Sequence, residues 1–182
     1  MGVDLSLVVR NNFAERENRK ATLAKLEAVK KLLDEKFGDG SFSIVNIEED
    51  KYNELSISDV RQEGKDELMY INLYDGFWLI DTAWRYHQYF SIIENRFWLR
   101  ETMFEYIRLL GATEAYACAD YQTWNNKYWK DEDTTFDYWQ RMCCKDLGHD
   151  IEVLDIQDVI NHKGTFYNKE AVYLDTFSDL II

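Results

Sequence analysis

The feature of this chain that most constrains its fold is an aspartate–glycine pair, Asp75-Gly76, between two runs of alternating apolar residues. An Asp-Gly pair accepts the positive φ angles of a type I′ turn, which joins two antiparallel strands. A two-residue loop sets Tyr74 opposite Phe77 and fixes the register of the pairs beyond them. Those pairs are Leu73 with Trp78, Ile71 with Ile80, Met69 with Thr82 and Glu67 with Trp84. We therefore predict a central hairpin with one apolar face and a mixed second face that is half covered or wet.

A helix is predicted directly after the hairpin. Ser91 and Glu94 have the spacing of a capping box, and Gly111 marks the end of the helix. Between them apolar residues recur every three or four positions, in a stripe wide enough to cover the apolar hairpin face. The stripe consists of Ile92, Ile93, Phe97, Leu99, Met103, Phe104, Tyr106, Ile107 and Leu110.

The same two periodicities predict the other elements. Alternating residues indicate strands at 3–10, 41–47, 52–60, 115–121, 151–156 and 171–177. Helical spacing indicates helices at 14–37 and from Thr134 to Gly148, with one helical turn at 155–162. This order lacks regular βαβ alternation, so we predict an α+β fold: a mostly antiparallel sheet built around the central hairpin, with about three helices packed on one face.

Length and composition indicate one domain spanning residues 1–182. The chain has 182 residues and 46% apolar content, with no proline and no linker-like run. Its apolar runs are far shorter than the roughly 20 residues that cross a bilayer, and its first residues lack the basic region and apolar core typical of a signal sequence. Three cysteines, Cys118, Cys143 and Cys144, are an odd number that fits reduced thiols. We expect a cytoplasmic protein.

The net charge of −13 narrows the class of partner. Residues 131–182 hold twelve acidic side chains against four basic ones. A charge of this sign argues against nucleic-acid binding and against docking on an anionic membrane. The acidic residues either keep an aromatic-rich protein in solution, which we favour, or form a face for a partner.

Signatures of catalysis are scarce in this sequence. It has no glycine-rich phosphate loop, no nucleophile elbow and no paired-histidine metal motif. His149 lies among Asp146, Asp150, Glu152 and Asp155, a set that suits either a cation or, as we favour, a solvated turn. Cys143 and Cys144 are adjacent, but Cys143 is predicted to face the core, where thiols are inert. We therefore expect no catalytic residue, no metal ligand and no cofactor.

The candidate binding residues are aromatic and polar side chains that lie outside the apolar stripes. A tryptophan among polar groups is often a recognition residue, although such rings also cap sheets. His87 and Arg85 lie on the same side of an alternating segment, and a histidine near an arginine can act as a general base. No nucleophile can be placed next to His87, however. The candidates are Trp84, Arg85, Tyr86, His87, Tyr89, Trp124, Tyr128 and Trp129.

Three functions are compatible with these residues. We expect an acidic protein-binding module without catalysis, of the inhibitor or immunity type made by bacteria or their phages. The first alternative is a small-molecule or nucleotide binder with an aromatic pocket beside Trp84 and Trp124. The second is a metal-dependent hydrolase that uses the carboxylates near His149.

Overall fold

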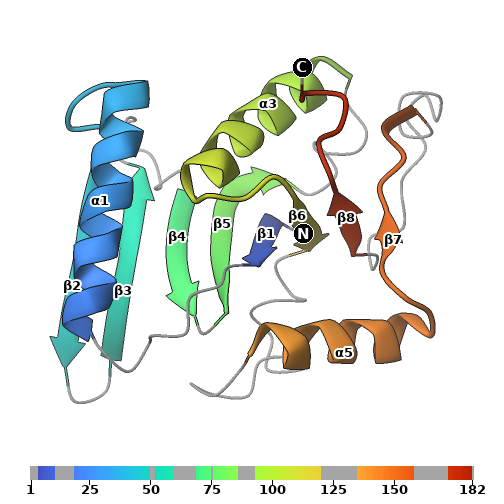
Figure 1. Cartoon of the computed structure of the whole chain (residues 1–182), viewed down its shortest axis with the longest axis horizontal. Coiled ribbons are helices and arrows are strands. Elements are labelled where there is room, and N and C mark those ends of the chain that lie inside the picture. Colours follow the sequence, from blue (N-terminus) through green and yellow to red (C-terminus); the bar gives the residue numbers. More distant parts are fainter. Residues whose placement is uncertain are drawn as a thin grey trace.

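A computed structural model describes residues 4–10, 19–49, 52–59, 69–74, 76–85, 93–119, 135–157 and 172–181. Its elements are β1 (Asp4–Arg10), α1 (Arg19–Phe37), β2 (Phe42–Glu49), β3 (Tyr52–Asp59), β4 (Met69–Tyr74), β5 (Phe77–Arg85), α3 (Ile93–Leu109), β6 (Ala115–Ala119), α5 (Phe136–Leu147), β7 (Glu152–Val153) and β8 (Tyr173–Asp175). The eight strands form one sheet in the order β2-β3-β4-β5-β1-β6-β8-β7 (Figure 1). Among these described strands, β7 and β8 pair in parallel and the other neighbours are antiparallel. The predicted α+β class is confirmed, and the described elements follow the predicted order; most of the predicted helical turn at 155–162 lies outside the described residues.

The hairpin of β4 and β5 has the predicted register. Four of its pairs are Tyr74 with Phe77, Leu73 with Trp78, Ile71 with Ile80 and Met69 with Thr82. Gly76 has a φ of 80°, a left-handed conformation that glycine adopts at no steric cost. The predicted partner of Trp84, Glu67, lies outside the described residues. The hairpin is adjacent to the middle of the sheet, because β1 inserts between β5 and β6 and makes β5 and β1 the central pair.

One face of the sheet carries the larger core, beneath α1 and α3. Leu7 of β1 and Ile80 of β5 are fully buried there, and Trp78 is 3% exposed. Both helices contribute buried apolar residues to this core, and those of α3 belong to its predicted stripe. The buried helix residues are Leu26, Val29 and Leu33 of α1 and Leu99, Met103, Phe104, Tyr106 and Ile107 of α3.

The opposite face carries a second core beneath α5. Val8, Phe77 and Leu79 of the sheet are buried there against Trp139 and Cys143 of α5. The prediction that all helices pack on one face is therefore wrong, and at these positions of β5 the mixed face is buried rather than wet. The physical reason lies in β1 and β5, whose consecutive apolar residues are typical of strands covered on both sides.

The ends of the helices follow local capping chemistry. The Thr135 hydroxyl accepts a hydrogen bond from the Tyr138 N–H at 3.2 Å, so the cap of α5 lies one residue after the predicted Thr134. Gly148 ends α5 as predicted, with a φ of 76° and its N–H donating to the Cys144 carbonyl at 2.9 Å. Helix α3 ends just before Gly111, whereas its predicted cap, Ser91, lies outside the described residues.

Two predicted C-terminal strands are longer than the observed ones. The structure has two paired residues in β7 and three in β8, where the sequence predicted 151–156 and 171–177. In contrast, the pairing of β2 and β3 extends further than predicted at the turn, because Glu49 already pairs with Tyr52 across a short connection. Within the described part of the chain, no helix has the length and apolar character needed to cross a membrane.

Candidate partner-binding edge

Most of the predicted binding residues cannot be compared with the structure. Trp84 and Arg85 form the end of β5, and Arg85 pairs with Asp4 of β1. The remaining candidates lie outside the described residues; they are Tyr86, His87, Tyr89, Trp124, Tyr128 and Trp129. The aromatic recognition surface therefore stays a prediction.

A buried hydrogen bond joins Ser6 of β1 to Asp81 of β5, near the end of β5 that carries Trp84. The Ser6 hydroxyl donates to Asp81 Oδ1 at 2.6 Å, and both residues are almost completely buried. On the other side of Ser6, the Cys118 thiol donates to the Ser6 carbonyl at 3.6 Å. These contacts join β5, β1 and β6 on the face covered by α5. Such a buried network stabilises the pairing of the central strands when its members are hydrogen-bonded.

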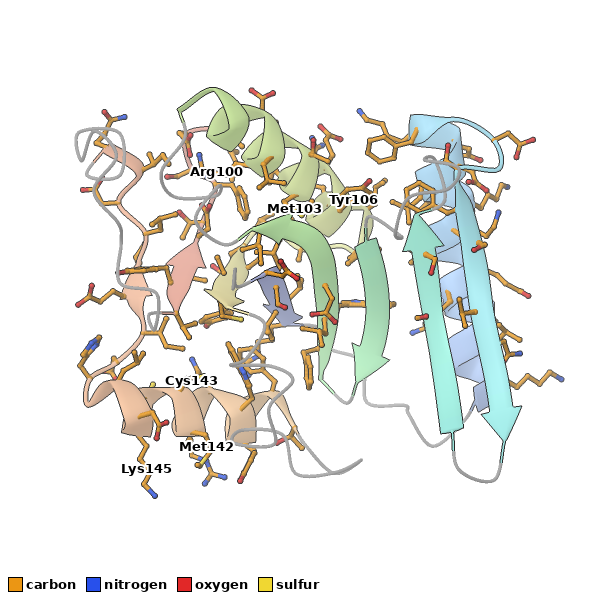
Figure 2. All side chains as sticks on the ribbon, turned by 180° about the vertical axis from the view of Figure 1, so that it is seen from behind. Arg100, Met103, Tyr106, Met142, Cys143 and Lys145 are labelled. Carbon is orange, nitrogen blue, oxygen red and sulfur yellow. The ribbon has the colours of Figure 1, made fainter. Side chains whose placement is uncertain are left out.

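No disulfide joins the thiols. All three cysteines are free, with Cys118 and Cys143 buried and Cys144 partly exposed. Figure 2 shows Cys143 on the sheet side of α5 and Lys145 on the opposite side. Burial raises the pKa of the Cys143 thiol to about 12. This thiol is therefore protonated at neutral pH and is a poor nucleophile.

The carboxylates near His149 do not converge. Asp146, Asp150, Glu152 and Asp155 are all exposed, and the Asp155 carboxylate accepts the Gln157 N–H at 2.8 Å. Among the described residues, no group of three or more histidine, cysteine, aspartate or glutamate side chains is arranged to hold a metal ion. The alternative of a metal-dependent hydrolase gains no support from these side chains.

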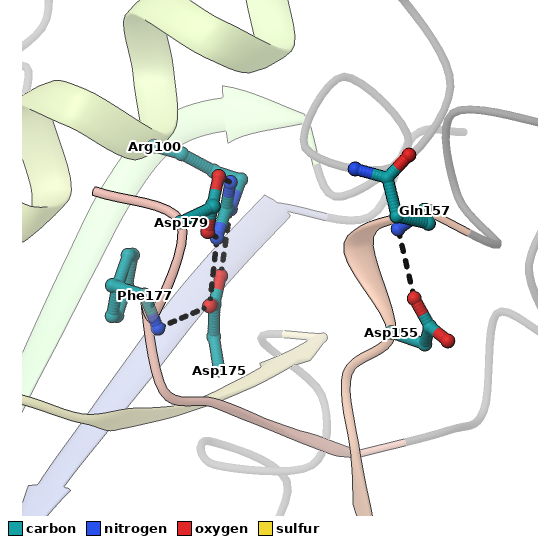
Figure 3. A network of polar contacts seen from close by, with 6 residues as sticks. All are labelled: Arg100, Asp155, Gln157, Asp175, Phe177 and Asp179. Atoms are coloured by element: carbon teal, nitrogen blue, oxygen red, sulfur yellow. Dashed lines mark hydrogen bonds and ion pairs between the residues drawn. The ribbon is translucent and has the colours of Figure 1, made fainter. Parts of the chain in front are cut away.

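A buried ion cluster joins α3 to the end of β8 (Figure 3). Arg100 donates from Nε and Nη2 to the Asp175 carboxylate at 2.8 and 2.9 Å, and from Nη1 and Nη2 to the Asp179 carboxylate at 2.9 Å. The side chains of Arg100 and Asp175 are 1% and 2% exposed, whereas that of Asp179 is 29% exposed. The hydrogen bonds from Arg100 hold the pKa of Asp179 below its usual value.

Phe177 is a further member of the buried cluster around Arg100. It is fully buried, its ring centroid lies 5.2 Å from that of Phe104, and its N–H donates to Asp175 Oδ1 at 2.9 Å. Its φ of 48° is rare for a bulky residue and stores strain. The cluster holds the C-terminal segment on α3, and sequence analysis missed it because Arg100 and Asp175 are 75 residues apart with no local pattern.

β2 is a long edge strand in the part of the sheet that the structure describes. Among the described strands, β2 has a neighbour on one side only, and its eight residues pair with β3 in continuous register from Phe42 to Glu49. Proteins usually blunt such edges with charged side chains, proline or a bulge. The sequence of β2, FSIVNIEE, has no proline and no lysine, and its charged residues are confined to its last two positions. The opposite edge, β7, is only two residues long. Of the two edges, β2 is the one that offers a full-length template for another strand.

A charged groove runs along α1 beside this edge. Asp34 joins α1 to the edge strand, because Asp34 Oδ1 accepts the N–H of Phe42, the first residue of β2, at 3.1 Å. The groove has a volume of about 400 Å³ and is lined by Glu27, Lys30, Lys31, Asp34, Glu35 and Asp39. Figure 1 shows α1 lying along β2 and β3 at this end of the sheet.

Both lysines of the groove have a carboxylate one helical turn away. Lys30 forms an ion pair with Asp34, and the Lys31 ammonium lies 3.8 Å from the Glu35 carboxylate. Glu27 and Asp39 have no basic partner within the part of the chain that the structure describes, so the groove carries an excess of negative charge. Sequence analysis did not single out this side of α1, because a sequence alone does not tell which strand lies at an edge of the sheet.

Comparison of the chain with models of protein families, with curated proteins and with solved structures finds no match. The functional proposal therefore depends on the geometry of the chain itself.

Proposed function

We propose that this chain is a small acidic cytoplasmic protein-binding module, an inhibitor or immunity-type interaction protein without catalysis, which holds its partner along β2. The observation that carries the proposal is the continuous eight-residue strand at the sheet edge. In β-strand addition, an extended segment of one protein pairs with such an edge; main-chain hydrogen bonds supply affinity and alternate side chains supply specificity.

The side chains of β2 support this mode of binding. Ile44 is half-buried at the margin of the core under α1, and Val45 is half-buried on the other face. An added strand would cover both residues with its own alternate side chains. The aromatic residues around Trp84 and Trp124 remain a predicted second contact with the partner.

A site-specific photo-cross-linker tests the proposal in the cells that make the protein. Placed at Val45, it should capture a distinct polypeptide, which mass spectrometry identifies and which then binds the purified chain. The matched control is Val153 of β7, 59% exposed on the short opposite edge, where the same polypeptide should not be captured. If positions 45, 124 and 129 all capture no polypeptide, the chain is not a protein-binding module.

A further inference from the structure

We infer that the strand received by β2 is a basic, extended segment of another protein, about eight residues long, in which lysine or arginine alternates with β-branched or apolar residues. This inference rests on the proposed function and adds the chemistry of the partner. The eight residues of β2 set the length, since a strand rises about 3.3 Å per residue and β2 therefore spans roughly 26 Å.

The groove beside α1 determines the charge of the partner. Residues of an added strand that point to the α1 side meet four carboxylates, Glu27, Asp34, Glu35 and Asp39, and only two lysines, both in ion pairs. The strand itself ends in Glu48 and Glu49. A lysine or arginine on this side packs its aliphatic stem near Ile44 and reaches the carboxylates with its charged head. Glu27 and Asp39 are the carboxylates left to receive it.

The other face of β2 determines the alternate residues of the partner. Val45 is half-buried on that face, and Ser43 beside it is small and also half-buried. A β-branched residue opposite Val45 forms the kind of cross-strand pair that stabilises antiparallel sheets. Basic residues on one side and β-branched residues on the other give the alternation that we infer.

The charge of the chain argues against a second copy as the occupant. Two copies would bring together two chains of net charge −13 and two acidic strand ends. Like charges across an interface oppose association and are a common device of specificity. A basic partner is attracted by the same field, which also accelerates its encounter with β2.

Binding of designed peptides tests the inference. The probe is a fluorescent peptide of about nine residues, with lysine at alternate positions and valine or threonine between them, so that it spans the length of β2. One control peptide has glutamate in place of lysine, and a second has two prolines, which remove donors that strand pairing needs. We expect the lysine peptide to bind at least about tenfold more tightly than either control.

Two variants of the protein and one control variant locate the binding. Val45→Lys places a charge on the edge and should weaken lysine-peptide binding at least about tenfold, whereas Val153→Lys on the other edge should not. Glu27→Gln combined with Asp39→Asn should weaken the same peptide severalfold and leave the glutamate peptide unaffected or improved. Melting of each variant checks that the fold is intact.

Four results would overturn the inference. Equal affinity for the lysine and glutamate peptides would mean that β2 adds a strand without preference for charge. If Val45→Lys leaves the affinity for the lysine peptide unchanged, the peptide is attracted to the acidic surface in general and not to β2. A dimer of the protein alone, dissociated by Val45→Lys, would make a second copy the occupant. A partner captured by the cross-linker at Val45 whose bound segment is not basic would remove this inference and retain the proposed function.

Discussion

Replacing Arg100 by methionine tests how much the buried ion cluster of Arg100, Asp175 and Asp179 stabilises the fold. The guanidinium is 1% exposed and makes two hydrogen bonds to Asp175, itself 2% exposed, so its loss leaves a buried carboxylate without its cation. Removing one partner of a buried pair costs about 3 to 5 kcal/mol. For a chain of this size each kcal/mol lowers the melting temperature by about 2 to 4 °C, so we expect a fall of roughly 6 to 20 °C.

Asp179 provides a matched comparison within the same cluster. It receives two hydrogen bonds from Arg100 of the same length, but its side chain is 29% exposed, so Asp179→Asn should cost about 1 kcal/mol or less. Because Arg100 lowers the pKa of Asp179 in the folded state, its contribution to stability is present above the unfolded pKa of about 3.9 and is lost as pH falls through the folded value. Stability of the parent should therefore decline more steeply than that of Asp179→Asn below about pH 4.

Urea unfolding of Arg100→Met, Asp175→Asn and the double variant measures the coupling. The double variant should be more stable than Arg100→Met alone, because it has no buried charge at position 175 and the carbonyl of the new amide side chain still accepts the Phe177 N–H. The reasoning would be refuted if Arg100→Met lowered the free energy of unfolding by less than about 1 kcal/mol, or if the double variant were less stable than Arg100→Met.

Three further predictions concern the core, the thiols and the aromatic surface. Trp78 is 3% exposed, so Trp78→Ala should cost about 3 to 5 kcal/mol in thermal unfolding; a melting temperature within a degree or two of the parent would contradict its place in the core. Since the pKa of Cys143 is raised to about 12, a thiol reagent at about pH 8 should label it slowly until the protein is denatured and should label Cys144 faster; rapid labelling of folded Cys143 would return the redox pair to consideration. Trp124→Ala and Trp129→Ala should leave melting almost unchanged and weaken partner binding by at least about 2 kcal/mol, whereas lost stability with intact binding would make both residues core caps.

Local chemistry made much of this fold predictable from sequence. The register of β4 and β5 follows from Asp75-Gly76, because a two-residue turn leaves one pairing that keeps Ile71 and Ile80 on the same face. The C-terminal end of α5 follows from Gly148 in the same way. Each of these signals depends on a few neighbouring residues, so it can be recognised in the sequence alone.

The arrangement of the layers depends on contacts that no local pattern encodes. The insertion of β1 between β5 and β6 decides that β2 is an edge, and the same insertion places Val8 under α5 on the second face. The pairing of Arg100 with Asp175 depends likewise on how α3 crosses β8. The candidate site was missed for this reason: the groove on α1 looks like any charged helix face until β2 is known to end the sheet.

Amide hydrogen exchange tests the central claim most directly, because it reports the β2 edge and the end of β5 in one measurement. The chain is compared alone and with the polypeptide captured at Val45. If the partner adds a strand, alternate amides of β2, residues 43–49, should exchange more slowly in the complex, while Trp84 and Arg85 should change less and Val153 of β7 should not change. Slowed exchange at Trp84 and Arg85 with no change anywhere in β2 would contradict the claim and place the binding surface at the aromatic residues instead.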